Sequence, residues 1–227
     1  MSEVSFRSEF EPIRDLKAEF RGAAVRFTIA AELAGVSIAA YETPDLPLFS
    51  ALPPEQQEVI TAQLNAQTEL ILEAKPEIGD YSYNRRMAWA QIRRHGLVLC
   101  SDVFEKLEDT DIIEIWDAKG HQLFRSFHGL KFFSYTLEEM FAYPFFELFE
   151  RESAELEVEY GQVFSKLIRG ETQTTIQVDI RPHLVREKRS RRRRTALMTP
   201  KIVSPLKNKQ GQVVAFFHTC SAKAIEN

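Results

Sequence analysis

The sequence predicts an α+β protein in which a helical N-terminal region is followed by a five-stranded antiparallel sheet. Two observations support this class. Apolar residues recur at helical spacing up to about residue 105. From Asp111 onward, short alternating segments separated by turn residues predict strands, and the elements follow the order β-β-α-α-α-β-β-β. We therefore expect a mainly helical region over 1–105, for dimerisation or output, and an α+β domain over 106–224.

The N-terminal region contains three stretches with helical patterns. Residues 5–42 are rich in helix formers, with apolar residues at helical spacing. Four prolines lie within 43–54 and predict a loop there. A helix is expected to start at Pro54 and to run to residue 74, because proline is favoured at the first helical position. A shorter helix is expected over 85–96.

The first part of the α+β domain alternates between strand and helix signals. Residues 111–127 predict two strands joined by the turn DAKG. A short helix is expected within 133–144, where Thr136 and Glu139 form a capping box. A longer amphipathic helix follows over 154–171, with Leu156, Tyr160, Val163, Phe164 and Leu167 on one face.

The remaining strands belong to the C-terminal part of the chain. TTIQVDIRP, residues 174–182, alternates between apolar and polar side chains and predicts a half-buried strand. Residues 195–222 predict two further strands joined by a turn at KNKQG. The segment HLVREKRSRRRR, residues 183–194, is then expected to be the turn between the third and fourth strands.

Three segments of this half resemble the PAS domain, a bacterial signalling module. They are FSYTLEEMFAYPFFELFERE, IRGETQTTIQVDIRP and SPLKNKQGQVVAFFHTCSA, in that order. The resemblance implies a five-stranded antiparallel sheet with helices on one face and a small ligand held between them. It also implies a homodimer that pairs through helices preceding the first strand. The segments 59–74 and 87–99 offer surfaces for such pairing.

An apolar ligand pocket is one interpretation of the large side chains in this domain, and ordinary core packing is the other. The candidate pocket residues are Phe133, Met140, Phe146, Phe149, Leu167, Ile176, Val178 and Leu197. The cofactor is unknown. The lack of a cysteine between Cys100 and Cys220 argues against photochemical flavin binding, and the lack of a histidine on the long helix argues against heme. His121 and His128 remain alternative ligands beside the second strand.

The most unusual feature is a run of basic residues in an acidic chain. Residues 181–194 hold eight Arg or Lys against one glutamate, in a chain of net charge −4. At a hairpin tip they are expected to project into solvent and to contact an anion. The candidate residues are Arg189, Arg191, Arg192, Arg193 and Arg194, with an acidic protein as the expected partner and nucleic acid as the alternative. The other interpretation is that the run is a solvated hairpin tip whose charge keeps sheet edges from pairing with other chains.

No catalytic motif or metal-ligand cluster is found, and no stretch is apolar enough to span a membrane. With two isolated cysteines and no signal peptide, we expect a cytoplasmic protein with reduced thiols. The function expected is that of a non-enzymatic bacterial signalling regulator that senses a ligand or binds a partner. The alternative is a DNA-binding regulator that uses the arginine hairpin or the N-terminal helices, where residues 28–42 resemble a helix-turn-helix without base-reading side chains.

Overall fold

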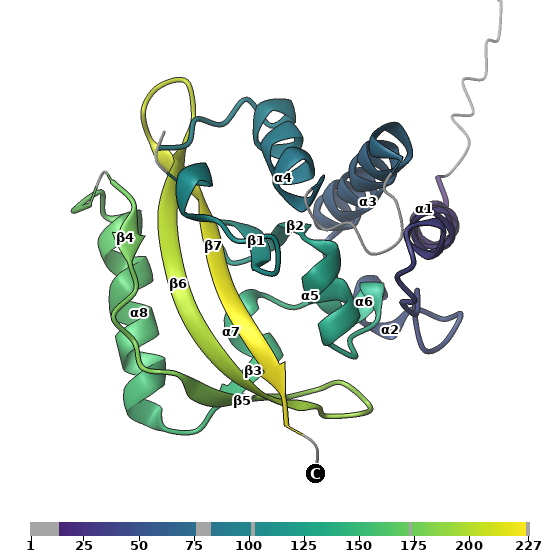
Figure 1. The fold of residues 1–227 in the computed structure, drawn as a ribbon. Coiled ribbons are helices and arrows are strands. Elements are labelled where there is room, and N and C mark those ends of the chain that lie inside the picture. Colours follow the sequence, from purple (N-terminus) through teal and green to yellow (C-terminus); the bar gives the residue numbers. More distant parts are fainter. Residues whose placement is uncertain (1–13, 76–82, 101–102, 173, 226–227) are drawn as a thin grey trace, which may run out of the picture.

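The structure is a computed structural model that describes residues 14–75, 83–100, 103–172 and 174–225 (Figure 1). The N-terminal helices are α1 (Leu16–Leu33), α2 (Pro47–Ser50), α3 (Pro54–Ala74) and α4 (Tyr83–Arg94), followed by the 3-10 turn η1 (Phe104–Lys106). The later helices are α5 (Phe127–Phe132), α6 (Leu137–Ala142), α7 (Phe145–Leu148) and α8 (Ala154–Ile168). The strands are β1 (Ile112–Asp117), β2 (Gln122–Arg125), β3 (Phe149–Arg151), β4 (Ile176–Gln177), β5 (His183–Glu187), β6 (Thr195–Lys207) and β7 (Val213–Ala224).

The predicted α+β class is confirmed. The strands form one antiparallel sheet in the order β2-β1-β7-β6-β5-β3, with β4 pairing with β6. Among the described residues the sheet has seven strands where five were expected, and two of them, β3 and β4, are very short. The long β6–β7 hairpin forms the centre of the curled sheet and turns at residues 208–212, where Gly211 has a φ of 80°. The expected turn at KNKQG is therefore present.

The third strand of the five does not lie where the alternation placed it. Of the predicted strand 174–182, only Ile176–Gln177 pairs within the sheet. The strand that pairs along β6 is β5, His183–Glu187, in the segment expected to be a turn. Burial alternates along this strand as well, but two of its three buried residues are His183 and Glu187. Because the buried side chains are mostly polar, the sequence shows no apolar alternation here that would predict a strand.

Helices cover both faces of the sheet, whereas the sequence led us to expect them on one. Phe216 and Phe217 are neighbours in β7 and so face opposite sides. Phe216 packs against Phe164 of α8, with ring centroids 5.5 Å apart, and Phe217 packs against Phe104 at 5.8 Å. Phe104 in turn contacts Trp89 of α4 at 5.5 Å. In Figure 1, α8 lies on one side of the β6–β7 hairpin, and α4, α3 and α1 lie on the other.

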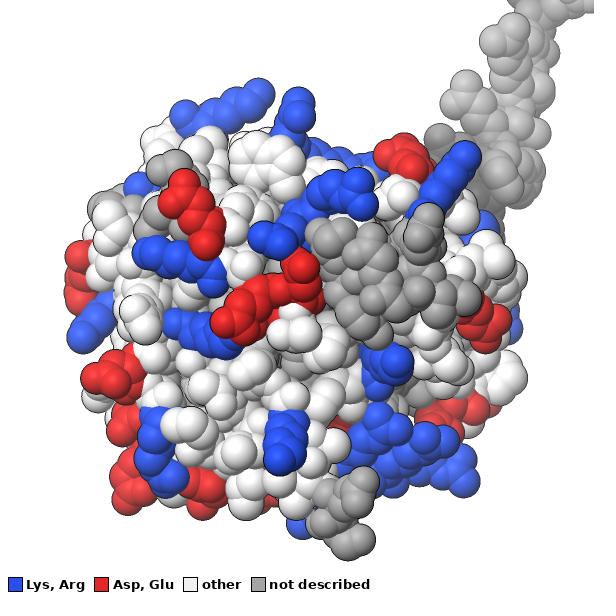
Figure 2. Space-filling view, viewed as in Figure 1, with Lys and Arg blue, Asp and Glu red and all other residues white. Residues whose placement is uncertain are grey.

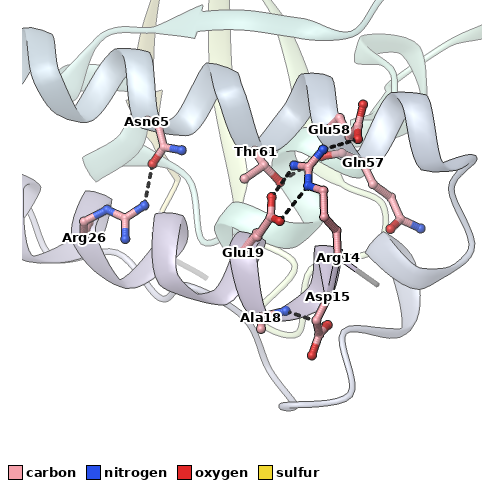
Figure 3. Close-up of polar contacts among 9 residues, drawn as sticks. All are labelled: Arg14, Asp15, Ala18, Glu19, Arg26, Gln57, Glu58, Thr61 and Asn65. Carbon is pink, nitrogen blue, oxygen red and sulfur yellow. Dashed lines mark hydrogen bonds and ion pairs between the residues drawn. The ribbon is translucent and has the colours of Figure 1, made fainter. Parts of the chain in front are cut away.

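The helices α1 and α3 pack side by side and are joined by polar contacts at their exposed edge (Figure 3). Arg14 donates to Glu19 of α1 and, at 2.6 Å, to Glu58 of α3. Further along, Arg26 donates to Asn65 at 2.7 Å. Beneath these contacts Phe20, Ala23 and Phe27 are buried, and they belong to the same apolar cluster as Ile115 and Phe217 of the sheet. The core therefore continues across the expected boundary at residue 105.

Residues 36–42 form no helix, so the second helix of the helix-turn-helix resemblance is not formed. The helix α1 ends at Leu33, and Gly35 turns the chain with a φ of 78°. The carbonyls of Ala39 and Ala40 then accept hydrogen bonds from the first two amides of α6, Leu137 and Glu138, at 3.0 and 3.1 Å. This segment extends along the α+β half of the molecule and offers no recognition helix.

Candidate functional site

A cavity of about 280 Å³ opens between α8 and the sheet. Its wall is mainly aromatic, since Trp116 of β1, Phe216 of β7, Phe145 of α7 and Phe164 of α8 all contribute. These rings pack against one another: the centroid of the Phe145 ring lies 5.1 Å from that of Trp116 and 5.7 Å from that of Phe164. Phe146, Ile168, Gly120 and Gly161 complete the apolar part of the lining.

Two polar side chains in the cavity wall have unused hydrogen-bonding capacity. Arg151 of β3 is 6% exposed, and its Nη1 donates to Glu157 at 2.7 Å, but its Nε has no partner. Its guanidinium lies 4.0 Å from the ring centroid of Tyr160, whose hydroxyl also lacks a hydrogen bond of good geometry. Burial raises the pKa of Tyr160 well above its ordinary value, so the phenol remains a neutral donor at physiological pH.

The eight residues expected to line a pocket are distributed over four environments. Phe146 alone lines this cavity. Phe133, Met140 and Phe149 lie in the larger core cluster, and Leu167, Ile176 and Val178 lie in the smaller cluster under α8. Leu197 is half-buried on β6. Most of these large side chains therefore fill the core, whereas Tyr160 and Phe164, already expected on the inward face of α8, do reach the cavity.

A buried charged group lies directly behind the cavity wall. Glu114 of β1 and Arg125 of β2 are register partners and form an ion pair of 2.8 Å, with side chains 2% and 0% exposed. His218 of β7 lies 3.2 Å from the second oxygen of Glu114. Although desolvation opposes it, the charge of Arg125 and the contact with His218 lower the pKa of Glu114.

Arg125 and His218 of this charged group contact two aromatic residues of the cavity wall. The guanidinium of Arg125 lies 5.6 Å from the Trp116 ring, and the His218 ring lies 5.9 Å from that of Phe145. Both aromatic residues line the cavity. A signal for the pair existed in the sequence: Glu114 interrupts the apolar run IIEIW, and the DAKG turn brings Arg125 opposite it in the hairpin.

The arginine side chains of the turn between β5 and β6 are exposed, as expected, but the turn is also anchored to the body of the protein. The amide of Lys188 donates to the carbonyl of Leu148 at 3.0 Å, and Arg194 Nη1 donates to the carbonyl of Phe132 at 2.9 Å. The guanidinium of Arg189 lies 4.8 Å from the Tyr143 ring. The turn is therefore held by the end of α5, by Tyr143 between α6 and α7, and by Leu148 at the end of α7.

A buried carboxylate explains this geometry. Glu187, 1% exposed at the end of β5, accepts hydrogen bonds from the amide of Ser134 at 2.6 Å and from the amide of Arg194 at 2.8 Å. The hydroxyls of Ser134 and Ser190 donate to it as well. Nearby, Arg193 has a φ of 45°, a backbone conformation that is rare for a residue other than glycine, and its amide donates to Ser190.

Other groups that could carry chemistry lie apart from the cavity. His121 contacts Asp117 at 3.1 Å and Gln56 at 2.8 Å on the β1–β2 turn, and His128 lies beside the arginine-rich turn. Cys100 is partly buried and Cys220 is buried. Within the described ranges, no group of three or more His, Cys, Asp or Glu is placed to hold a metal ion, and no helix is long and apolar enough to cross a membrane.

Comparison with known proteins assigns no family. No protein-family model matches the chain, and no curated protein matches it at a significant level.

Proposed function

We propose that the chain is a PAS-like, non-enzymatic signalling regulator that senses a small molecule in the cavity beneath α8. The observation that carries the proposal is this aromatic cavity, whose wall also contains the polar side chains of Arg151 and Tyr160. The order of elements supports it: two strands, a series of helices and then the strands β5, β6 and β7 follow one another as in the resemblance.

The dimensions of the cavity favour a compact ligand. About 280 Å³ lies at the lower end of the range for small-molecule sites, which suits a molecule of one or two rings. Aromatic walls would hold its rings. Arg151 and Tyr160 both line the cavity and carry hydrogen-bond donors, so a ligand with an acceptor such as a carbonyl or carboxylate would suit them after a small side-chain movement.

A route from this domain to the N-terminal helices supports a regulatory mechanism. Gln67 of α3 and Gln91 of α4 both donate to the carbonyl of Leu123 in β2, at 2.8 and 3.0 Å. Asn84 of α4 accepts from the first amide of α5, Phe127, at 3.0 Å. A ligand that binds one arrangement of the sheet better than another would shift the population of the attached helices.

Gly161 provides a test of the cavity, because it lies in the cavity wall on α8 and a Cβ added there meets no atom within 4 Å. Gly161→Ala should stabilise the protein by about 0.5–1 kcal/mol through helix propensity and leave the cavity open. Gly161→Leu should fill the cavity. Native mass spectrometry and thermal shifts with indole and indole-3-acetate should show binding to wild type and Gly161→Ala and a loss of at least tenfold in Gly161→Leu. Equal binding by all three proteins would place the ligand elsewhere.

We also propose a homodimer, formed through α1. Val25, Ile29 and Leu33 are spaced four residues apart on this helix and are 42%, 54% and 68% exposed, so they form one apolar stripe on its outer face. In the segments 59–74 and 87–99, which were expected to pair with a second copy, Leu64 and Ile71 are buried within the chain, whereas Val59, Leu72 and Trp89 are about half exposed. The stripe on α1 is a continuous apolar surface that a second copy could cover.

The dimer is tested by placing a charge in the stripe. Ile29→Glu should halve the molar mass measured by light scattering, because burying a carboxylate in the interface is unfavourable. Val158→Glu on α8, which is 58% exposed in the monomer, is the matched control and should leave the mass unchanged. A wild-type protein of monomeric mass would contradict the proposal.

The alternative function, a DNA-binding regulator, now rests on the arginine-rich turn alone. The segment 36–42 is not helical, and residues 39 and 40 are engaged by α6. The arrangement of the basic residues points to a smaller anion.

A further inference from the structure

The arginine-rich turn forms one wall of a concave basic surface. Two adjoining pockets, of about 500 and 660 Å³, share Lys131 of α5 with Arg192 and Arg194 of the turn. The first also contains His128 and Phe132, and the second also contains Arg191 and Ser37. We call these two pockets together the basic groove. In Figure 2, Lys and Arg gather at the lower right, where Figure 1 places the β5–β6 hairpin.

The positive charge in the basic groove is only partly balanced by carboxylates. Among the described residues, Lys131, Arg192 and Arg193 form no ion pair within 4.0 Å. Glu42 is the acidic residue in the lining, and it pairs with Arg191 at 3.5 Å. Glu187 lies behind the turn, where backbone amides and hydroxyls engage its oxygens. The groove therefore attracts anions.

The shape of the basic groove decides which anion fits. These cations line hollows of about 500 and 660 Å³, which is the size of small-molecule sites. Guanidinium groups bind phosphate oxygens in pairs, and several cations together suit more than one phosphate. The half-buried ring of Phe132 offers an apolar wall beside them.

We propose that the basic groove binds an organic polyphosphate of the nucleoside di- or triphosphate class, with its phosphates between Lys131 and Arg192 and its ring system against Phe132. This site shares no lining residue with the cavity beneath α8 and does not depend on the sensor function proposed for that cavity. The buried Glu187 holds the backbone of the turn in position, so the arginines are placed beside Lys131 before the ligand arrives. Preorganisation of this kind lowers the entropy lost on binding.

The test uses the full chain and isothermal titration with ATP, tripolyphosphate, a 20-bp DNA duplex and a polyglutamate peptide, at about 0.15 M salt. Wild type should bind ATP more tightly than the other three probes. The double variant Lys131→Ala/Arg192→Ala should weaken ATP binding at least tenfold. Its melting temperature without ligand should match wild type, because neither side chain makes an ion pair in the protein. The matched control Lys166→Ala/Arg169→Ala removes the same charge from exposed positions at the C-terminal end of α8 and directly after it, and should leave ATP binding unchanged.

Three results would overturn the proposal. ATP binding that is equal in wild type and in the Lys131→Ala/Arg192→Ala variant would place the ligand elsewhere. If tripolyphosphate bound as tightly as ATP, the proposed contact between the ligand's ring system and Phe132 would contribute nothing to the affinity. Tighter binding of the duplex or of polyglutamate than of ATP would make the groove part of a macromolecular interface. None of these results bears on the Gly161 variants, so the two sites are tested separately.

Discussion

Replacing Arg125 with methionine is expected to destabilise the protein by about 3–5 kcal/mol, because the change leaves the Glu114 carboxylate buried without its counter-charge. Methionine keeps much of the apolar stem, so packing against Trp116 and Phe133 is largely retained. Urea unfolding followed by tryptophan fluorescence measures the change. Arg169→Met removes an exposed pair with Glu171 and should cost no more than about 1 kcal/mol.

The double variant Glu114→Leu/Arg125→Met separates the charge from the packing. Removing both partners eliminates the buried charges together, so the double variant should be clearly more stable than Arg125→Met alone. A loss equal to the sum of the two single losses would show that Glu114 and Arg125 are not energetically coupled. The expected result would show that Glu114 and Arg125 are energetically coupled and that much of the loss in Arg125→Met comes from the uncompensated charge of Glu114.

The pair of Glu114 and Arg125 is also expected to control how the free energy of unfolding changes at acidic pH. The pKa of Glu114 is lowered in the folded state: desolvation opposes the shift, and Arg125 and His218 outweigh it. A carboxylate with a lowered pKa contributes stability above its unfolded value, about 4.3, and this stability is lost as pH falls through the folded value. Wild type should therefore lose unfolding free energy more steeply below about pH 4.3 than the double variant. Parallel curves would show that other carboxylates control acid unfolding.

The elements with strong local signals were predictable from the sequence. Pro54 marks the start of α3, and the Thr136–Glu139 capping box begins α6 as expected. The turn at KNKQG lies between β6 and β7. In each of these cases the residue that fixes the boundary acts on neighbours within a few positions, so the sequence alone contains the information.

The site was harder to predict because it depends on contacts between distant segments. Arg151 belongs to β3, whose three residues pair with β5 only in the folded sheet. The short helix α5, which supplies Lys131 and Phe132 to the basic groove, has no apolar periodicity of its own and was not predicted. The basic residues were recognised from composition, but their concave arrangement depends on Glu187, a charged residue at a buried strand position.

Glu187→Ala is expected to destabilise the protein by about 2–4 kcal/mol, because the amides of Ser134 and Arg194 and two serine hydroxyls lose a common acceptor in a buried site. Urea unfolding measures the loss. Glu150→Ala, at an exposed position of neighbouring β3, is the control and should change stability by no more than about 0.5 kcal/mol.

The larger consequence of Glu187→Ala should be local. Without the carboxylate, the Arg194 amide loses its acceptor, and Ser190, which accepts from the Arg193 amide, loses its own, so the amide hydrogens of this turn should exchange faster than they do in wild type. Because the arginines would no longer be held beside Lys131, ATP affinity should fall in this variant under conditions where it remains folded. Unchanged exchange at Arg194 in the folded variant would mean that the contacts of Lys188 and of the Arg194 side chain hold the turn without Glu187.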